Sequence, residues 1–291
     1  MTRYRVSHVT IYRYGEPVTV SHNVLHLAPA NTSRQRVESF TLDISPVPAV
    51  QHQRADYFGN RVDCFTVQDQ HTQLIVRAES VLEVEPAFAL DAQVTSPWEG
   101  VRDHLYHPQG DDEVLASEFR FDSPMVPTGA EYAAYAAESF TPGRPLLDAA
   151  LDLVHRIYTG FVYDQKATAV NTTVPEVFLK RRGVCQDFAH FGIACLRSLG
   201  LASRYVSGYL ETEPPPGQVK LIGVDASHAW MSLWCPGIGW IGLDPTNDCL
   251  ASDRHLIVAV GRDFTDISPT KGVILGGGTH EVQAVVDVSR I

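Results

Sequence analysis

The sequence predicts an α+β protein that begins with an antiparallel β domain, and three observations predict this. Up to about residue 90, β-branched and aromatic residues alternate with polar ones, as is typical of short antiparallel strands. Between residues 131 and 200, apolar residues recur at helical spacing. From residue 203 onward the alternation of strands returns. The chain therefore reads as strands, then helices, then strands again.

The first domain, residues 1–90, is predicted to be a sandwich or half-barrel. Strands are expected over 4–12, 18–27, 37–44 and 74–84. Turn signals separate them at Gly15-Glu16-Pro17, Pro29-Ala30-Asn31, Pro46-Val47-Pro48 and Gly59-Asn60. Residues 91–130 form a connector, because prolines and the acidic run Asp111-Asp112-Glu113 interrupt the pattern, and one short helix is expected there over 114–119.

The second domain, residues 131–291, opens with helices over 131–140, 146–158 and 173–180. Thr173 and Glu176 have the spacing of a capping box at the start of the third helix. A fourth helix is expected from Cys185 to about Gly200, followed by strands over 203–210, 226–234 and 240–243. Pro236-Gly237-Ile238-Gly239 predicts a hairpin between the last two strands. The remaining residues form a β-rich C-terminal segment.

Composition narrows the classes of function. The formal net charge of −11 argues against binding of nucleic acid or anionic lipid, because like charges repel at the surface. No apolar run reaches membrane-spanning length and the first residues lack a signal-peptide pattern, so a cytoplasmic location is expected. The five cysteines lack the short spacings of zinc knuckles, and the histidines are dispersed, so neither a metal site nor a cofactor is predicted.

Cys185 is the candidate nucleophile because Gly183 delivers it onto the first turn of a predicted helix. The positive end of the helix macrodipole and the free backbone N–H groups there favour a thiolate. Taken alone, however, a free cysteine is more often a small core residue than a reactive one.

His228 and Asp244 are the candidate partners of Cys185. Alternate residues of a strand share a face, so a hairpin that pairs even-numbered with even-numbered residues puts both side chains on one face. A hairpin with odd pairing separates them. In the first case Cys185 is the nucleophile, His228 the base and acid, and Asp244 the group that orients the imidazole. The backbone N–H of Cys185 is one oxyanion donor, and Tyr163, Gln165 and Asn171 are candidates for the second.

Four short motifs in order resemble the transglutaminase-like superfamily in its bacterial branch, which is often described as predicted cysteine proteases. They are the segments 183–190 and 202–210, His228-Ala229-Trp230, and Gly239-Trp240 with Asp244-Pro245-Thr246-Asn247. The resemblance extends to Tyr57-Phe58-Gly59-Asn60 in the first domain, which is similar to the N-terminal domain of that branch, and to the segments 261–264 and 266–272. It implies a papain-like catalytic fold over residues 131 to about 260, with the triad roles given above.

The sequence also departs from its wider relatives. Gln186 stands after the cysteine where animal transglutaminases have tryptophan, and no calcium site is evident, which puts protein crosslinking in doubt. Leu179 occupies the place of the glutamine oxyanion donor of papain.

Several other residues are interpreted as structural. Asp187 is expected to favour the helix start, His190 to pack with a hydrogen bond, and Cys195 to lie in the core. Trp230, Trp234 and Trp240 are expected in the core, Asn247 in a turn, and Gly276-Gly277-Gly278 with His280 in a loop.

The predicted function is acyl transfer from an amide or peptide bond through a thioester on Cys185, most simply by a protease or amidase. The partner is then a peptide or another amide, and the oligomeric state is left open. One alternative is a transglutaminase or ligase that passes the acyl group to an amine. A second, from another class, is a non-catalytic module that binds peptides in the same groove.

Overall fold

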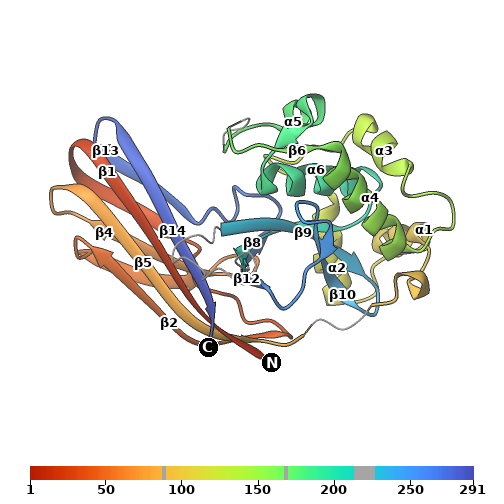
Figure 1. Cartoon of the computed structure of the whole chain (residues 1–291), viewed down its shortest axis with the longest axis horizontal. Helices are drawn as coiled ribbons and strands as arrows, with labels where there is room; N and C mark the ends of the chain where they lie inside the picture. The colour runs from red at the N-terminus through yellow and green to blue at the C-terminus, as the bar shows by residue number, and fades with distance from the viewer. Residues whose placement is uncertain (87–89, 167–169, 213–226) are drawn as a thin grey trace, which may run out of the picture.

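The computed structural model describes residues 1–86, 90–166, 170–212 and 227–291. In these residues a large antiparallel sheet lies beside a second unit, in which helices pack on a smaller sheet (Figure 1). The α+β composition and the antiparallel β region at the start of the chain are therefore confirmed. Within the described residues, no helix is long and apolar enough to cross a lipid bilayer.

The large sheet is curled and has the strand order β2-β5-β1-β4-β3, with β13 and β14 also paired to β1. Its inner face buries a small core of its own, which includes Leu25, Phe65 and Leu74. The strands are β1 (Thr2–Leu25), β2 (Gln35–Ser45), β3 (Val50–Ala55), β4 (Arg61–Val67), β5 (His71–Val84), β13 (Thr270–Gly276) and β14 (His280–Arg290).

Strand β1 is continuous where the sequence predicts a turn at Gly15-Glu16-Pro17, so that turn prediction is wrong. The backbone N–H of Gly15 donates to the carbonyl of Thr279 at 2.7 Å, and that of Glu16 donates to Gly277 at 3.1 Å. The register of β1 against β5 shifts at this point. Pro17 has no N–H to contribute, and such an irregularity tolerates it. Hydrogen bonds from the far end of the chain thus keep this segment extended.

The strands β13 and β14 correct the predicted domain division. Sequence analysis assigns residues 270–290 to the second domain, but β14 pairs with the first half of β1, from Tyr4 with Arg290 to Tyr14 with His280. β13 pairs with the second half of β1. Gly277 and Gly278 lie between these two strands, as the predicted loop requires, whereas Gly276 ends β13 and His280 begins β14. A local alternating pattern identifies a strand but not its distant partner, which explains the misassignment.

The connector contains more helix than predicted. A 3₁₀ turn η1 (Ala92–Val94) is followed by α1 (Trp98–Tyr106), α2 (Asp111–Ser117) and a second 3₁₀ turn η2 (Glu118–Arg120). The helix α2 begins in the predicted acidic run, where carboxylates favour the positive end of the helix. The helix α1 was not predicted, and it buries Trp98, Val101 and Leu105 against the second unit.

The second unit is a five-stranded sheet of order β11-β10-β9-β8-β12 with helices packed on it. A separate parallel pair joins β6 to β7. The strands are β6 (Val162–Tyr163), β7 (Arg182–Gly183), β8 (Ser203–Leu210), β9 (Ser227–Cys235), β10 (Gly239–Asp244), β11 (Cys249–Leu250) and β12 (His255–Gly261). The helices are α3 (Ala130–Ala137), α4 (Leu146–Gly160), α5 (Val174–Lys180) and α6 (Cys185–Ser198). These bounds agree closely with the predicted ones, and the predicted capping box of Thr173 and Glu176 is present.

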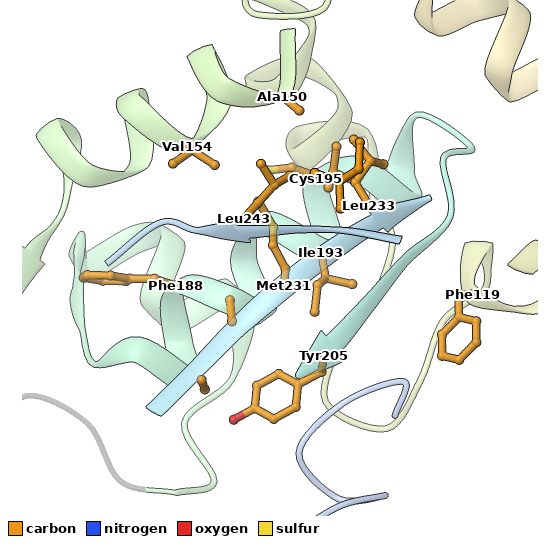
Figure 2. Packing of buried hydrophobic residues seen from close by; sticks show 14 of the residues in the cluster. Phe119, Ala150, Val154, Phe188, Ile193, Cys195, Tyr205, Met231, Leu233 and Leu243 are labelled. Atoms are coloured by element: carbon orange, nitrogen blue, oxygen red, sulfur yellow. The ribbon is translucent and has the colours of Figure 1, made fainter. Parts of the chain in front are cut away.

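The central helix α6 is buried on nearly all sides. A Cβ atom on Gly192 would stand 2.5 Å from the sulfur of Met231, so only glycine allows α6 to approach β9 this closely. Figure 2 shows side chains from α4, α6 and the sheet meeting in one core. The tight packing fixes the start of α6 relative to β9 and β10.

Two amide side chains from the large sheet cover the free edge of β12. The Gln35 amide accepts from the N–H of Ile257 at 2.8 Å and donates to its carbonyl at 2.7 Å. The Asn60 amide does the same with Val260, at 2.9 and 2.8 Å. Each amide replaces the partner strand that an edge would otherwise leave missing. The asparagine of the segment Tyr57-Phe58-Gly59-Asn60 thus joins the large sheet to the second unit by hydrogen bonds.

Candidate active site

Local structure places Cys185 at the first position of α6. The helix α5 ends at Arg181, whose φ of 53° turns the chain, and β7 then pairs with β6. A Cβ atom on Gly183 would stand 2.7 Å from Asp187, so glycine is needed at this close approach. The carboxylate of Asp187 accepts from the backbone N–H of Val184 at 2.8 Å. Asp187 therefore caps the helix start, in agreement with its structural interpretation.

The hairpin of β9 and β10 pairs even-numbered with even-numbered residues. Trp240 lies opposite Trp234, and Gly242 lies opposite Ser232. This is the register in which His228 and Asp244 share a face. In the structure, Nε2 of His228 is 2.7 Å from Oδ2 of Asp244.

Asp244 is fully buried and accepts hydrogen bonds on both oxygens. Besides His228, the side chains of Asn247 and His255 donate to Oδ2 at 2.7 and 3.1 Å. The backbone N–H groups of Thr246 and Asn247 donate to Oδ1 at 2.9 and 3.3 Å. Burial favours the neutral acid and raises the pKa of Asp244, but the hydrogen bonds from His228 and His255 outweigh it and hold that pKa well below its usual value. The site therefore keeps a buried carboxylate charged.

His228 links this carboxylate to the thiol. Since Nε2 of its ring is bonded to Asp244, Nδ1 remains for Cys185. Burial lowers the pKa of His228, but the bond to Asp244 and the interaction with nearby Cys185 more than offset this and raise the pKa to about 10. The arrangement favours an imidazolium between two acceptors.

His255 is a partner of Asp244 that sequence reasoning missed. The N–H of Ser252 donates to Nδ1 of His255 at 3.1 Å, so the proton of the ring lies on Nε2 and points at Asp244. No spacing in the sequence signals this, because β12 lies at the far edge of the sheet. Asn247, interpreted as a turn residue, is also part of the network.

The side chains of this network are also of the types that bind metal ions. The candidate ligand atoms of His228, Asp244 and His255 lie within 4.8 Å of one another. However, both Nε2 atoms donate their protons to Asp244, so neither offers a lone pair in this arrangement. The donor set fits a hydrogen-bonded network rather than a metal centre.

Trp230 holds both imidazoles in place. Its ring stacks on His228, with centroids 5.9 Å apart, and meets His255 edge-on at 5.2 Å. It is 1 % exposed, as expected for a core tryptophan, and so is shielded from water together with the network.

Two tyrosines lie near the thiol. Burial raises the pKa of Tyr205 well above its usual value, and the charge of Cys185 adds to this. The pKa of Tyr163 is raised by the same two causes in the same order, while an interaction with the side chain of Gln165 lowers it. Tyr163 is thus the candidate second oxyanion donor that interacts with Cys185. Asn171 instead lines a cavity of about 650 Å³ beside α5.

That cavity has an apolar wall close to Cys185. The side chain of Gln186, next to Cys185, donates to the carbonyl of Val170 at 2.9 Å, and Val170 lines the cavity together with Pro175 and Phe264. The position where animal transglutaminases have tryptophan here ties a loop to the start of α6.

The remaining predicted residues have structural surroundings. His190 is 2 % exposed and accepts from the N–H of Phe264 at 3.2 Å. Cys195 is fully buried, and burial raises the pKa of its thiol. Trp234 is 5 % exposed, whereas Trp240 is half-buried and lines a cavity on the same sheet.

Two family models match this chain. The bacterial transglutaminase-like N-terminal region matches residues 4–83, and the transglutaminase-like superfamily matches residues 133–245. An uncharacterized protein of Mycobacterium tuberculosis is 44 % identical over 295 residues, which cover 99 % of this chain and 91 % of the relative. A protein-glutamine gamma-glutamyltransferase of Pseudomonas aeruginosa is 35 % identical over 89 residues, or 30 % of this chain and 13 % of that protein.

A solved structure shares the fold. It is named "Putative Cysteine Protease" from Cytophaga hutchinsonii and matches with a TM-score of 0.78 at 18 % identity, over 100 % of this chain and 91 % of that one. Fold and sequence agree, as the motifs around Cys185, His228 and Asp244 predict: the chain belongs to the transglutaminase-like superfamily and carries the bacterial transglutaminase-like N-terminal region.

Proposed function

We propose that this chain is a cysteine-dependent acyl-transfer enzyme that acts on amide or peptide bonds, as a protease or amidase. The observation that carries the proposal is the bond of 2.7 Å between Nε2 of His228 and buried Asp244, which leaves Nδ1 for Cys185. A thiolate beside a held imidazolium is the pair that cysteine nucleophiles require.

In the proposed mechanism, the thiolate of Cys185 attacks the amide carbonyl carbon, and a C–S bond forms as the carbonyl becomes an oxyanion. The backbone N–H of Cys185 at the start of α6 and the hydroxyl of Tyr163 donate to that oxyanion. The C–N bond breaks while Nδ1 of His228 gives its proton to the departing amine. Water then attacks the thioester and passes a proton to His228, and the carboxylic acid leaves with the thiolate restored.

The apolar cavity beside α5 supports binding of an acyl donor with an apolar side chain. Its walls include Pro175 and Phe264, and Gln186, next to Cys185, donates to the carbonyl of Val170 in the same wall. We propose a peptide or a related amide as the substrate on this basis.

Transfer to an amine is the second candidate. The similarity to a protein-glutamine gamma-glutamyltransferase over 89 residues favours it. The same thioester serves both outcomes, because water and an amine compete for one acyl carbon.

The test is intact-protein mass spectrometry after short incubation with peptide libraries, with and without an added primary amine. We expect an acyl adduct on Cys185 that hydroxylamine removes, and products that report water or the amine as acceptor. Cys185→Ala should abolish the adduct, whereas Cys64→Ala, at a half-buried cysteine of β4, should not. Peptide binding that survives in Cys185→Ala, together with no adduct in the natural protein, would favour the non-catalytic binding module instead.

We also propose the cytoplasm as the location. The support is that all five cysteines are unpaired, since reducing compartments keep thiols free. Cell fractionation with antibody detection tests this, and recovery in an extracytoplasmic fraction would overturn it.

A further inference from the structure

A second cavity, of about 650 Å³, lies where the large sheet, the connector and the small sheet meet. Figure 1 shows α2 next to β8 and β10 at this side of the second unit. Aromatic side chains from all three parts form its walls, and one cation, Arg204 of β8, faces it. The aromatic residues are Tyr57, Phe58, Phe119, Trp234 and Trp240.

Arg204 is unusual because its guanidinium has no hydrogen-bond or ionic partner among the described residues. Its Nε atom is buried and unpaired, and its guanidinium carbon lies 4.2 Å from the ring centre of Trp240. Burial lowers the pKa of Arg204 to about 9. The Nε–H group of half-buried Arg204 is withdrawn from water without an acceptor, which costs free energy unless something pairs with it.

Arg197, a buried arginine, shows how the same fold satisfies a guanidinium. It donates to the carbonyls of Ser203, Phe121 and Arg262 and to the hydroxyl of Ser123, at 2.7 to 3.1 Å. The terminal amino groups of Arg204 have no such acceptors among the described residues, and Arg204 lines the cavity. Arg204 therefore lacks the contacts that a purely structural arginine has here.

Three carboxylates line the cavity, those of Asp112, Glu113 and Glu118. Glu118 accepts from the hydroxyl of Tyr57 at 2.7 Å. Glu113 accepts from the N–H of Gln109 at 2.6 Å and lies 2.8 Å from Nε2 of His104. Asp112 is exposed in the first turn of α2. None of the three forms an ion pair with Arg204 in the described residues, but their charge disfavours a ligand with more than one negative charge.

The cavity is distinct from the triad although both lie on one face of the sheet. Arg204 lies opposite Ser232, and Trp240 opposite Trp234, so all four side chains share the even-numbered face with Asp244. Trp240 and Asp244 are four residues apart on β10, which corresponds to roughly 13 Å along a strand. A small ligand in the cavity does not reach the thiol.

We propose that this cavity binds a monoanionic carboxylate carried on a flat apolar group. The carboxylate pairs with the planar fork of Arg204, and the flat group packs between the aromatic walls. The inference does not depend on the proposed acyl-transfer activity, since it concerns other residues.

The test is isothermal titration of the protein with benzoate, benzamide and phenyl phosphate as probes, in the Cys185→Ala background and in the natural protein. We expect saturable binding of benzoate in both, and weaker binding of the neutral amide and of the dianionic phosphate. Losing one charge-assisted hydrogen bond lowers affinity by about 10- to 100-fold, so Arg204→Met should weaken benzoate binding by that factor. Arg204→Lys keeps the charge but not the fork and should be intermediate.

Arg102→Met is the matched control, because Arg102 also stacks on a tryptophan, Trp98, at 5.2 Å, but lies outside the cavity. It should bind benzoate as the natural protein does. Equal binding of benzamide and benzoate, unchanged binding in Arg204→Met, or no saturable binding at millimolar benzoate would each overturn the proposal. If Arg204→Met fails to fold, the comparison of benzoate with benzamide on the natural protein still decides it.

Discussion

The even-numbered face of the small sheet carries a buried carboxylate and a half-buried guanidinium, and their hydrogen bonding differs. Near the end of β10, Asp244 accepts five hydrogen bonds and faces two imidazoles. Near the start of the same strand, Arg204 lies against Trp240 with no acceptor among the described residues. The comparison shows that burial alone does not reveal the role of a charged side chain. Whether all its hydrogen-bonding groups have partners is more informative.

A complete network fixes geometry, whereas an incomplete one leaves a requirement for a partner. Asp244 needs nothing further and can hold His228 in one tautomer. Arg204 needs an acceptor, which we infer to be a ligand. The following predictions test each half of this comparison.

Asp244→Asn should have the largest effect, a fall in acyl-transfer rate of about 10³- to 10⁴-fold, as expected when an orienting carboxylate is lost. The amide cannot stabilise an imidazolium, and its NH₂ group opposes the proton of His228 or His255. Single-turnover kinetics of thioester formation measures the change. The control is Asp248→Asn, because Asp248 pairs with exposed His155 outside the network, and it should retain full activity. Equal rates in the two variants would show that the network does not serve catalysis.

Replacing Asp244 and replacing Arg204 should change the free energy of unfolding by different amounts. Breaking a buried, paired charge typically costs about 3–5 kcal/mol, so Asp244→Asn should lower the free energy of unfolding by that order. Arg204→Met replaces an unpaired charge by apolar atoms and should leave the free energy of unfolding within about 1 kcal/mol or raise it. Urea unfolding without ligand compares them. A large loss in Arg204→Met would mean that Arg204 is itself a structural contact.

His255→Phe should reduce activity by about 10- to 100-fold, which corresponds to one hydrogen bond to a charged group. The bond from His255 lowers the pKa of Asp244, so its loss raises that pKa. The acid limb of the pH–rate profile should therefore move to higher pH, which a merely structural defect would not cause. Trp230→Phe, which removes no donor to Asp244, is the control and should leave that limb in place.

The last prediction concerns the pH dependence of stability. The pKa of His228 is about 10 in the folded protein and about 6.5 in the unfolded chain, so the folded state holds an extra proton between these values. The contribution of His228 is complete below pH 6.5 and is lost as the pH rises to 10, with a slope of at most about 1.4 kcal/mol per pH unit. Unfolding of the natural protein and of His228→Gln at several pH values gives the difference. A difference that stays constant with pH would contradict the raised pKa.

Much of the fold follows from local patterns. The bounds of α4, α5, α6 and β8 agree with prediction because each element carries its own periodicity and its own caps. The turn at Gly15-Glu16-Pro17 and the assignment of 270–290 failed because both depend on pairing between the two ends of the chain. The helix α1 was missed because prolines flank it and its burial depends on the second unit.

Some residues of the candidate site could likewise be predicted from local patterns, and others could not. Cys185, His228 and Asp244 could be chosen from motif order and strand parity, because helix starts and hairpins are local structures. His255 could not, since β12 reaches the site only across the width of the sheet.

By itself, the sequence therefore determined the helix that presents Cys185, the hairpin that carries His228 and Asp244, and the superfamily. Only the tertiary structure decided that the hairpin pairs even with even, that His255 completes the network, and that Arg204 is left without an acceptor. The physical reason is that hydrogen bonds and burial depend on which distant segments meet, whereas helix periodicity, capping and strand alternation act between near neighbours.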